Sequence, residues 1–340
     1  MKPKTLTLVV LSLVLVAGVA LWRHRIKQSQ SVPSAATRTD AARKQTFTFG
    51  KKSRAMPSAP VRTQSVTNFD LETLSPPVRL IVSAQEVFAT RFASAKLAGA
   101  HLSPADQQAL YAFLLERNPL DAQQEGQVLK NRVMDALCEL NPPPAQLGDL
   151  LIQMYRDVSQ DAVLRDYAIQ HLAAYYEQLD QAAGMDPQAK HDEETKVQSI
   201  LWEALSEVGS SISGTALLAL TRLSEGRPEF DRNQIGATAL QLAKEAVAGE
   251  LTRITALEVC ARLGVGDALP LLALAAQAGE TMPVRIAAVG ALGVLGGSDQ
   301  TALLNELANS PEERLKVPAL QALKQISKRE RLAAQTQTKG

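Results

Sequence analysis

The sequence predicts an all-α protein organised as an α-solenoid, in which short helices stack in pairs. Residues 253–264 and 285–296 place apolar residues at matching positions, and a repeat of that length is typical of stacked helical units rather than of one globular core. Hydrophobic residues make up 46% of the chain but aromatic residues only 4%, so the core must consist mainly of Leu, Ala, Val and Ile. Leu and Ala favour helix, and few β-branched or aromatic runs compete for strand.

The first element is a hydrophobic segment within residues 1–27. Thr5–Trp22 contains no charged residue, and basic residues lie on both sides of it. A helix of about 18 residues is about 27 Å long, close to the hydrocarbon thickness of a bilayer. The segment therefore predicts one transmembrane helix over about residues 5–22, acting as an N-terminal membrane anchor. A signal peptide cleaved after Ala20 is the alternative.

Charge is unevenly distributed along the chain. Residues 1–75 hold 12 of the 36 Lys and Arg residues but only 3 of the 35 Asp and Glu residues. The rest is therefore net acidic, which argues against nucleic-acid binding, because that requires a clustered positive surface. Because basic residues lie on both sides of the anchor, the positive-inside rule does not decide its orientation. Single N-terminal anchors usually export the part of the chain that comes after them, so the remainder is expected to be extracytoplasmic (periplasmic).

Residues 28–75 are expected to be a flexible basic linker. They are rich in Ser, Thr, Gln, Ala and Pro and show no apolar period. Such a segment cannot bury enough apolar surface to offset the entropy lost on ordering.

Residues 76–158 predict degenerate helical repeats. Ser103, Pro104 and Asp106 place an N-cap, a first-turn proline and an early carboxylate before an apolar run. A helix over 131–140 must end at the three prolines of 142–144, and residues 145–158 supply its partner.

Residues 159–327 predict clearer, HEAT-like repeats. Four pairs of helices are expected: one from 164 with 194–207, 212–224 with 233–248, 252–263 with 268–277, and 284–295 with 300–308. Together with the helices of residues 76–158 this gives about six pairs, with 315–326 as a capping helix and 328–340 as a frayed polar tail. Gly264 and Gly296 suit left-handed helix ends, and Asp267 and Asp299 suit the N-caps that follow.

The residues of this array match a known family. The run Pro283-Val-Arg-Ile-Ala-Ala-Val-Gly-Ala-Leu-Gly-Val-Leu-Gly296 resembles the first helix of a HEAT repeat, in the subgroup also found in phycobilisome lyases. Arg165, Arg253 and Arg285 fall on one repeat position, which Lys316 takes in the last unit. The match is closest over 252–327 and extends over 160–250. As a whole, the chain is similar to membrane-anchored, bacterial-type HEAT-repeat proteins.

No residues suggest catalysis or a metal site. None of the four histidines, His24, His101, His171 and His191, is spaced from another as helical metal ligands would be. One hydroxylase built on HEAT-like repeats holds iron through repeated His-Glu pairs, and this chain has none. We therefore predict no catalytic residues, no cofactor and no metal, and the binding residues remain unknown.

Other polar and aromatic groups have structural interpretations. The acidic run 192–194 is expected in a solvated loop, and the arginine series is expected to hold the stack together by pairing with carboxylates or helix ends. The glycines at 264–266 and 209–214 lack the spacing of a phosphate loop or a nucleophile elbow. Trp202, Tyr175 and Tyr176 are expected to be packing residues, and Cys138 and Cys260 to be buried free thiols.

Together these features predict a membrane-tethered, non-catalytic scaffold that binds another protein through its helical-repeat surface. The predicted partner is a protein, and neither an enzyme activity nor a small-molecule substrate is expected. Two alternatives stay open: an enzyme subunit related to HEAT-like tetrapyrrole (bilin) lyases, and a structural envelope protein.

Overall fold

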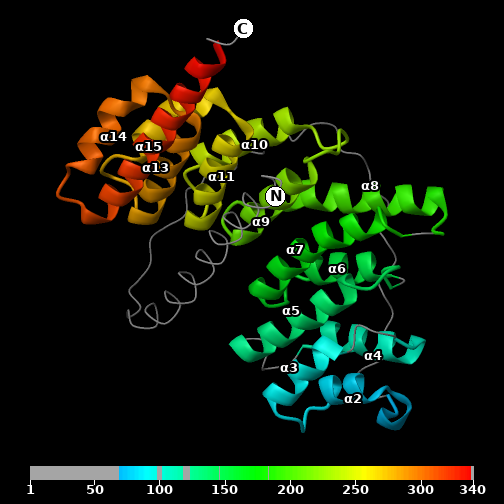
Figure 1. Ribbon diagram of the computed structural model, residues 1–340. Helices are drawn as coiled ribbons and strands as arrows, with labels where there is room; N and C mark the ends of the chain where they lie inside the picture. Colours follow the sequence, from blue (N-terminus) through cyan, green and yellow to red (C-terminus); the bar gives the residue numbers. More distant parts are fainter. Residues whose placement is uncertain (1–68, 98–101, 118–122, 145, 183, 338–340) are drawn as a thin grey trace, which may run out of the picture. The chain divides into compact units, whose positions relative to one another are not determined.

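The computed structural model describes residues 69–340, apart from 98–101, 118–122, 145, 183 and 338–340. These residues form α-helices and short 3-10 turns, with no strand among them, as expected for an α-solenoid (Figure 1). They all belong to one compact unit, Ser53–Gly340. None of the helices described is both long enough and apolar enough to cross a bilayer. The predicted anchor and most of the predicted linker lie outside the described residues.

The helices follow one another as antiparallel pairs. Contacts join each even-numbered helix to the odd-numbered helix that follows it. The pairs are α2 (Pro76–Val82) with α3 (Phe88–Leu97), α4 (Pro104–Leu115) with α5 (Gln124–Cys138), α6 (Leu147–Arg156) with α7 (Ala162–Leu179), α8 (Pro187–Ala204) with α9 (Ser211–Leu223), α10 (Arg232–Lys244) with α11 (Glu250–Leu263), α12 (Leu269–Ala275) with α13 (Met282–Leu295), and α14 (Thr301–Ala308) with α15 (Glu313–Gln337).

This pairing corrects the predicted one. The sequence pairs each arginine-bearing helix with the helix after it and leaves α15 as a cap. In the structure α11 packs on α10, α13 on α12 and α15 on α14, so the arginine-bearing helix is the second of its pair and α15 completes a pair. The predicted contact between α7 and α8 is present, since α8 packs on both α7 and α9. The sequence period fixes how often helices recur, but both neighbours in the chain offer apolar faces, so the period does not decide which neighbour a helix packs against.

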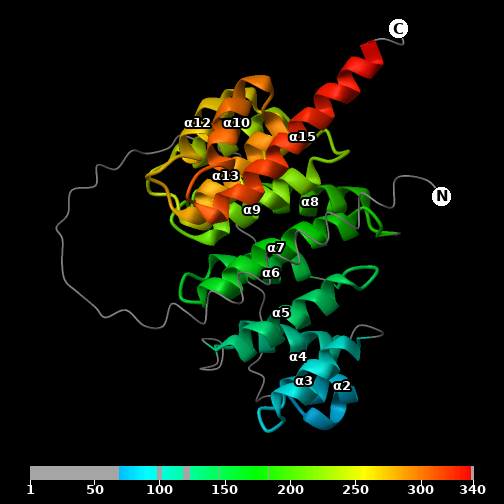
Figure 2. The ribbon, with the colours of Figure 1, turned by 60° about the vertical axis from the view of Figure 1, so that its left-hand side comes forward.

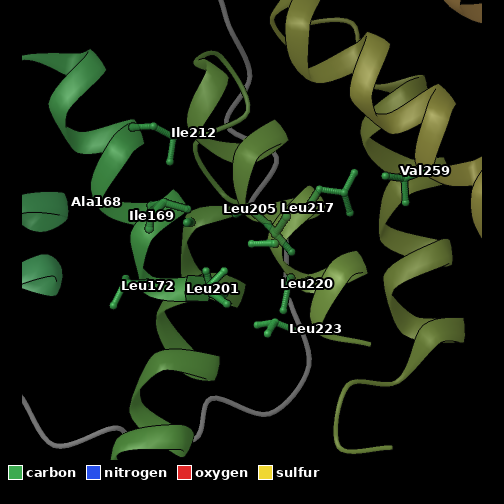
Figure 3. Close-up of a cluster of buried hydrophobic side chains, with 14 of the residues drawn as sticks. Ala168, Ile169, Leu172, Leu201, Leu205, Ile212, Leu217, Leu220, Leu223 and Val259 are labelled. Atoms are coloured by element: carbon green, nitrogen blue, oxygen red, sulfur yellow. The ribbon is translucent and has the colours of Figure 1, made fainter. Parts of the chain in front are cut away.

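The odd-numbered helices form the closely packed layer. Each of α3, α5, α7, α9, α11 and α13 packs along its length on the next odd-numbered helix, whereas the even-numbered helices touch one another much less (Figure 2). Gly293 permits a close approach between α13 and α15, since a Cβ there would lie 2.8 Å from the Cα of Ala322 on α15. The apolar core lies between the two layers. Figure 3 shows one part of it, where Ile169, Leu201 and Leu217 meet from α7, α8 and α9.

The predicted start of α4 is confirmed. Ser103 caps the helix, and its side chain and that of Asp106 form a reciprocal capping box. Asp106 also accepts hydrogen bonds from the backbone N (2.8 Å) and Oγ (3.0 Å) of Ser75, the residue before α2. Burial raises the pKa of this carboxyl, but the hydrogen bonds from Ser75 and Ser103 outweigh it and hold the pKa below its usual value. One side chain thus joins the starts of two neighbouring helices.

The predicted helix ends are confirmed in part. Gly264 ends α11 in the left-handed region, with φ of 74°. Gly296 ends α13 in an extended conformation instead, and glycine is needed there because a Cβ would lie 2.6 Å from the Leu292 carbonyl oxygen. Asp267 and Asp299 are not N-caps: each lies within a 3-10 turn that leads into the next helix.

Two helices are longer than predicted. α8 begins at Pro187, because Asp186 caps it and proline suits a first turn, so the acidic run 192–194 is helical rather than in a loop. α15 continues to Gln337 instead of fraying after residue 327. Arg329 accounts for part of this extension, since its guanidinium donates to the carbonyls of Gly293 and Gly296 at the end of α13.

Candidate functional site

A row of polar side chains runs along the odd-numbered layer. Each is the fourth residue of its helix, and we call the set the first-turn ladder: Arg91, Gln127, Arg165, Arg253, Arg285 and Lys316. Most members contact an acidic residue that lies just before the next odd-numbered helix. The prediction that the arginine series holds the stack together is confirmed by these contacts.

Arg165 shows how a rung is built. Its Nε donates to the carbonyl of Tyr155 (2.7 Å) near the end of α6, and its Nη2 pairs with Glu207 (2.6 Å) before α9. Arg285 repeats the arrangement, since its Nε donates to the carbonyl of Ala276 at the end of α12 (3.2 Å). One guanidinium therefore satisfies an open carbonyl of its own pair and also reaches the next repeat.

Arg253 and Glu280 make the most regular rung. Two parallel hydrogen bonds of 2.9 and 2.6 Å join the guanidinium to the carboxylate. The hydrogen bond from Arg253 lowers the pKa of the Glu280 carboxyl, and the same bond raises the pKa of the arginine. This bidentate geometry is the strongest form of such a pair.

We expect the Arg253–Glu280 rung to couple the two residues by about 1–2 kcal/mol, because both side chains are largely shielded from water. Unfolding free energies of Arg253→Met, Glu280→Gln and the double variant measure this coupling. The exposed pair Arg262–Glu225, examined the same way, should give well under 1 kcal/mol. Equal coupling in both pairs would contradict a special role for the ladder.

Sequence reasoning missed the N-terminal members of the ladder. Arg91 donates from Nε to the carbonyl of Ile81 (2.8 Å), as Arg165 and Arg285 do to theirs, and Gln127 donates to Asp161 before α7 (3.1 Å). Glutamine replaces arginine there, and the surrounding repeats share little sequence, so residue identity gave no signal. α9 has Ser213-Gly214 at this point, where Ser213 instead shares a hydrogen bond with Thr252 of α11 (3.0 Å).

The histidines do not meet. His171 is buried on α7 with Nε2 2.9 Å from Oδ1 of Asn131, and His191 is exposed on α8, while His24 and His101 lie outside the described residues. The acidic run on α8 is engaged with lysines: Glu193 pairs with Lys196, and its neighbour Glu194 with Lys190. Within the described ranges, no three His, Cys, Asp or Glu side chains are grouped as a metal site would need.

The aromatic and sulfur side chains pack, as predicted. Tyr175 and Tyr176 are buried, and their hydroxyls donate to Glu193 and Glu229 (3.2 Å each). Trp202 is half-buried against the core. Cys138 and Cys260 are buried free thiols whose pKa burial raises to about 12, so neither is a reactive thiolate.

The glycine-containing segments also have structural roles. The first, around Gly264 and Gly266, links α11 to the turn before α12. The second begins α9, where Ser211 Oγ donates to Asp166 of α7 (2.9 Å). Both segments connect helices, and neither follows a strand, which a phosphate loop or a nucleophile elbow requires.

An apolar strip lies exposed on α13. Ile286, Gly290 and Val294 recur at four-residue spacing and so share one face of the helix. Ile286 and Val294 are 36% and 49% exposed, and nothing lies within 4 Å of a Cβ built on Gly290. Leu251, on the neighbouring helix α11, is also exposed. We call these four residues the α13 strip, and an exposed apolar surface of this kind is a candidate binding surface.

Comparisons with known proteins add little. No family model matches the chain, and no curated protein matches it. Among solved structures, human deoxyhypusine hydroxylase in complex with glycerol is similar, with 21% identity over 74% of this chain and 94% of that chain, and a TM-score of 0.26. A likeness of this size carries no argument about activity.

The predicted function needs correction. A membrane-tethered, non-catalytic scaffold that binds another protein was expected; the similar solved structure is that of an enzyme, and the scaffold expectation is not retained. A more specific function has to be argued from the chain's own residues.

Proposed function

We propose that this chain is a subunit of an enzyme that handles a linear tetrapyrrole, in the manner of HEAT-like bilin lyases. The α13 strip is the observation that carries the proposal. It lies within residues 252–327, the part of the sequence that most resembles the lyase subgroup of HEAT repeats, apart from Leu251 at its edge.

The strip suits a flat apolar ligand. A tetrapyrrole presents planar rings that need a smooth apolar surface, and the glycine between Ile286 and Val294 leaves that surface without a protruding side chain. The exposed guanidinium of Arg262, on the adjacent helix α11, is available to pair with a propionate in exchange for Glu225. Burial of the Ile286 and Val294 side chains under the ligand would contribute about 1–2 kcal/mol each to the free energy of binding.

The test is a titration of the protein with biliverdin or haem, in which absorbance measures binding. We expect a saturable spectral change with the full chain, and at least tenfold weaker binding when Ile286→Glu and Val294→Glu are combined, because charge replaces the apolar strip. Leu274→Glu on α12 is the matched control, since Leu274 is 66% exposed in the other layer. No spectral change, or equal binding by the strip and control variants, would overturn the proposal.

We further infer that residues 5–22 anchor the chain and that the remainder is extracytoplasmic, on the strength of the uncharged run Thr5–Trp22. Carbonate extraction of membranes tests the anchor, and release of the chain by carbonate would contradict it. Protease accessibility in intact cells and spheroplasts tests the side of the membrane.

A further inference from the structure

We propose that the array associates head to tail with a second copy of itself, because the first-turn ladder ends in complementary half-rungs. This inference goes beyond the proposed function and does not depend on it. The last ladder cation, Lys316 on α15, has no following repeat among the described residues. The first carboxylate position, before α3, has no ladder cation on an earlier odd-numbered helix within the same described ranges.

The N-terminal half-rung is Glu86. In the Arg253 rung the carboxylate belongs to Glu280, two residues before α13, and Glu86 stands likewise two residues before α3. The turn geometry agrees, since Arg91 N bonds to Val87 O (3.2 Å) as Arg285 N bonds to Thr281 O (3.0 Å). No hydrogen bond or ion pair joins the Glu86 carboxylate to any residue that the structure describes.

The C-terminal half-rung is Lys316. It occupies the position of Arg253 and Arg285, but its ion pair is with Glu313 of its own helix (2.6 Å). Glu313 is strongly exposed, and an exposed pair within one helix contributes little to stability. Lys316 can therefore exchange this partner for a better shielded carboxylate.

Apolar side chains flank both half-rungs. The eighth residue of α11 is Leu257 and that of α13 is Val289, and both are almost completely buried in helices on which the following odd-numbered helix packs. The eighth residue of α15 is Leu320, which is 57% exposed, and Val317 beside it is exposed as well. At the other end Val87, next to Glu86, is 67% exposed.

The occupant that fits these two ends is the opposite end of another copy. It would pair Glu86 with Lys316, as Glu280 pairs with Arg253 inside the array, and would cover the exposed side chains of Val87 and Leu320. Such an interface joins two different surfaces, so it propagates until a ring closes or the ends are blocked.

The experiment compares charge-reversed full chains by sedimentation velocity in mild detergent. The wild type should self-associate with increasing concentration. Lys316→Glu alone and Glu86→Lys alone should each weaken association at least about tenfold, because each places like charges at the junction. A mixture of these two variants should regain association, because a junction between Lys316 of one variant and Glu86 of the other joins opposite charges.

Controls separate this junction from other contacts. Leu320→Glu should abolish association, whereas Leu274→Glu on α12, an exposed leucine of the other layer, should leave it unchanged. Circular dichroism should show the same helix content for every variant. A monomeric wild type, association insensitive to the charge reversals, or a mixture that stays dissociated would overturn the proposal, whatever the tetrapyrrole titration shows.

Discussion

Lys130→Ala is expected to lower the free energy of unfolding by about 3–5 kcal/mol. Lys130, on α5, is 1% exposed, and its Nζ donates to the carbonyls of Leu114 (3.2 Å) and Glu116 (2.6 Å) at the end of α4. The ammonium also lies 5.7 Å from the centre of the Phe113 ring. Truncation removes this cap from two carbonyls and leaves the space of the buried side chain empty. Urea denaturation followed by circular dichroism measures the loss.

Two comparison variants locate the source of this effect. Lys130→Met keeps most of the aliphatic volume but not the ammonium, so its loss reports the unpaired carbonyls and the missing contact with Phe113 without a cavity, and should be about 1–3 kcal/mol. Lys244→Ala, at an exposed lysine in the last turn of α10, should change stability by less than about 0.5 kcal/mol. A similar small effect at Lys130 would show that the carbonyls find water in its absence.

Short sequence patterns were sufficient to predict features that depend only on interactions between adjacent residues. The N-cap at Ser103, the left-handed Gly264 and a helix over about 252–263 all depend on a few adjacent residues, and all were predicted. The repeat at 253 and 285 also fixed the position of the ladder arginines in their helices. These features need no knowledge of which helix lies beside which.

Contacts between repeats could not be predicted in the same way. A lysine at position 130 within a polar helix is normally solvated, and only the end of α4, 14 or more residues earlier in the chain, makes it a buried cap. The acidic partner of Arg165 lies 42 residues away across an entire helix. Such pairings depend on the register between helices, which short-range patterns do not encode.

The surface was harder still to interpret. Ile286 and Val294 fit the apolar pattern of α13 as well as its buried residues do, because that helix is apolar on almost every side. Only the packing of α11, α12 and α15 around it shows which residues are left in solvent. The α13 strip therefore emerges from the structure alone, as does the pairing of Lys316 within its own helix, although the sequence already placed Lys316 at the repeat position.

A fall in pH from about 6.5 to about 4 is expected to cost about 3 kcal/mol of stability through His171 alone. The side chain is buried between α5 and α7, and this burial lowers the pKa of the imidazole from 6.5 to about 4. Between these values the unfolded chain binds a proton that the folded protein does not. The contribution of the neutral His171 to the free energy of unfolding is therefore fully present above pH 6.5 and is lost as the pH falls towards 4.

His171→Gln isolates this contribution from the carboxylates that titrate in the same range. Glutamine can still donate to Oδ1 of Asn131, as the neutral imidazole does, but it takes up no proton. Asp135 lies 3.8 Å from Nε2, and burial raises the pKa of its carboxyl, so its own titration opposes the histidine term and is present in both proteins. The difference in unfolding free energy between wild type and variant, measured from about pH 7.5 to about pH 4, should shift by about 3 kcal/mol. A constant difference would mean that the folded protein protonates His171 as readily as the unfolded chain, with Asp135 stabilising the charge.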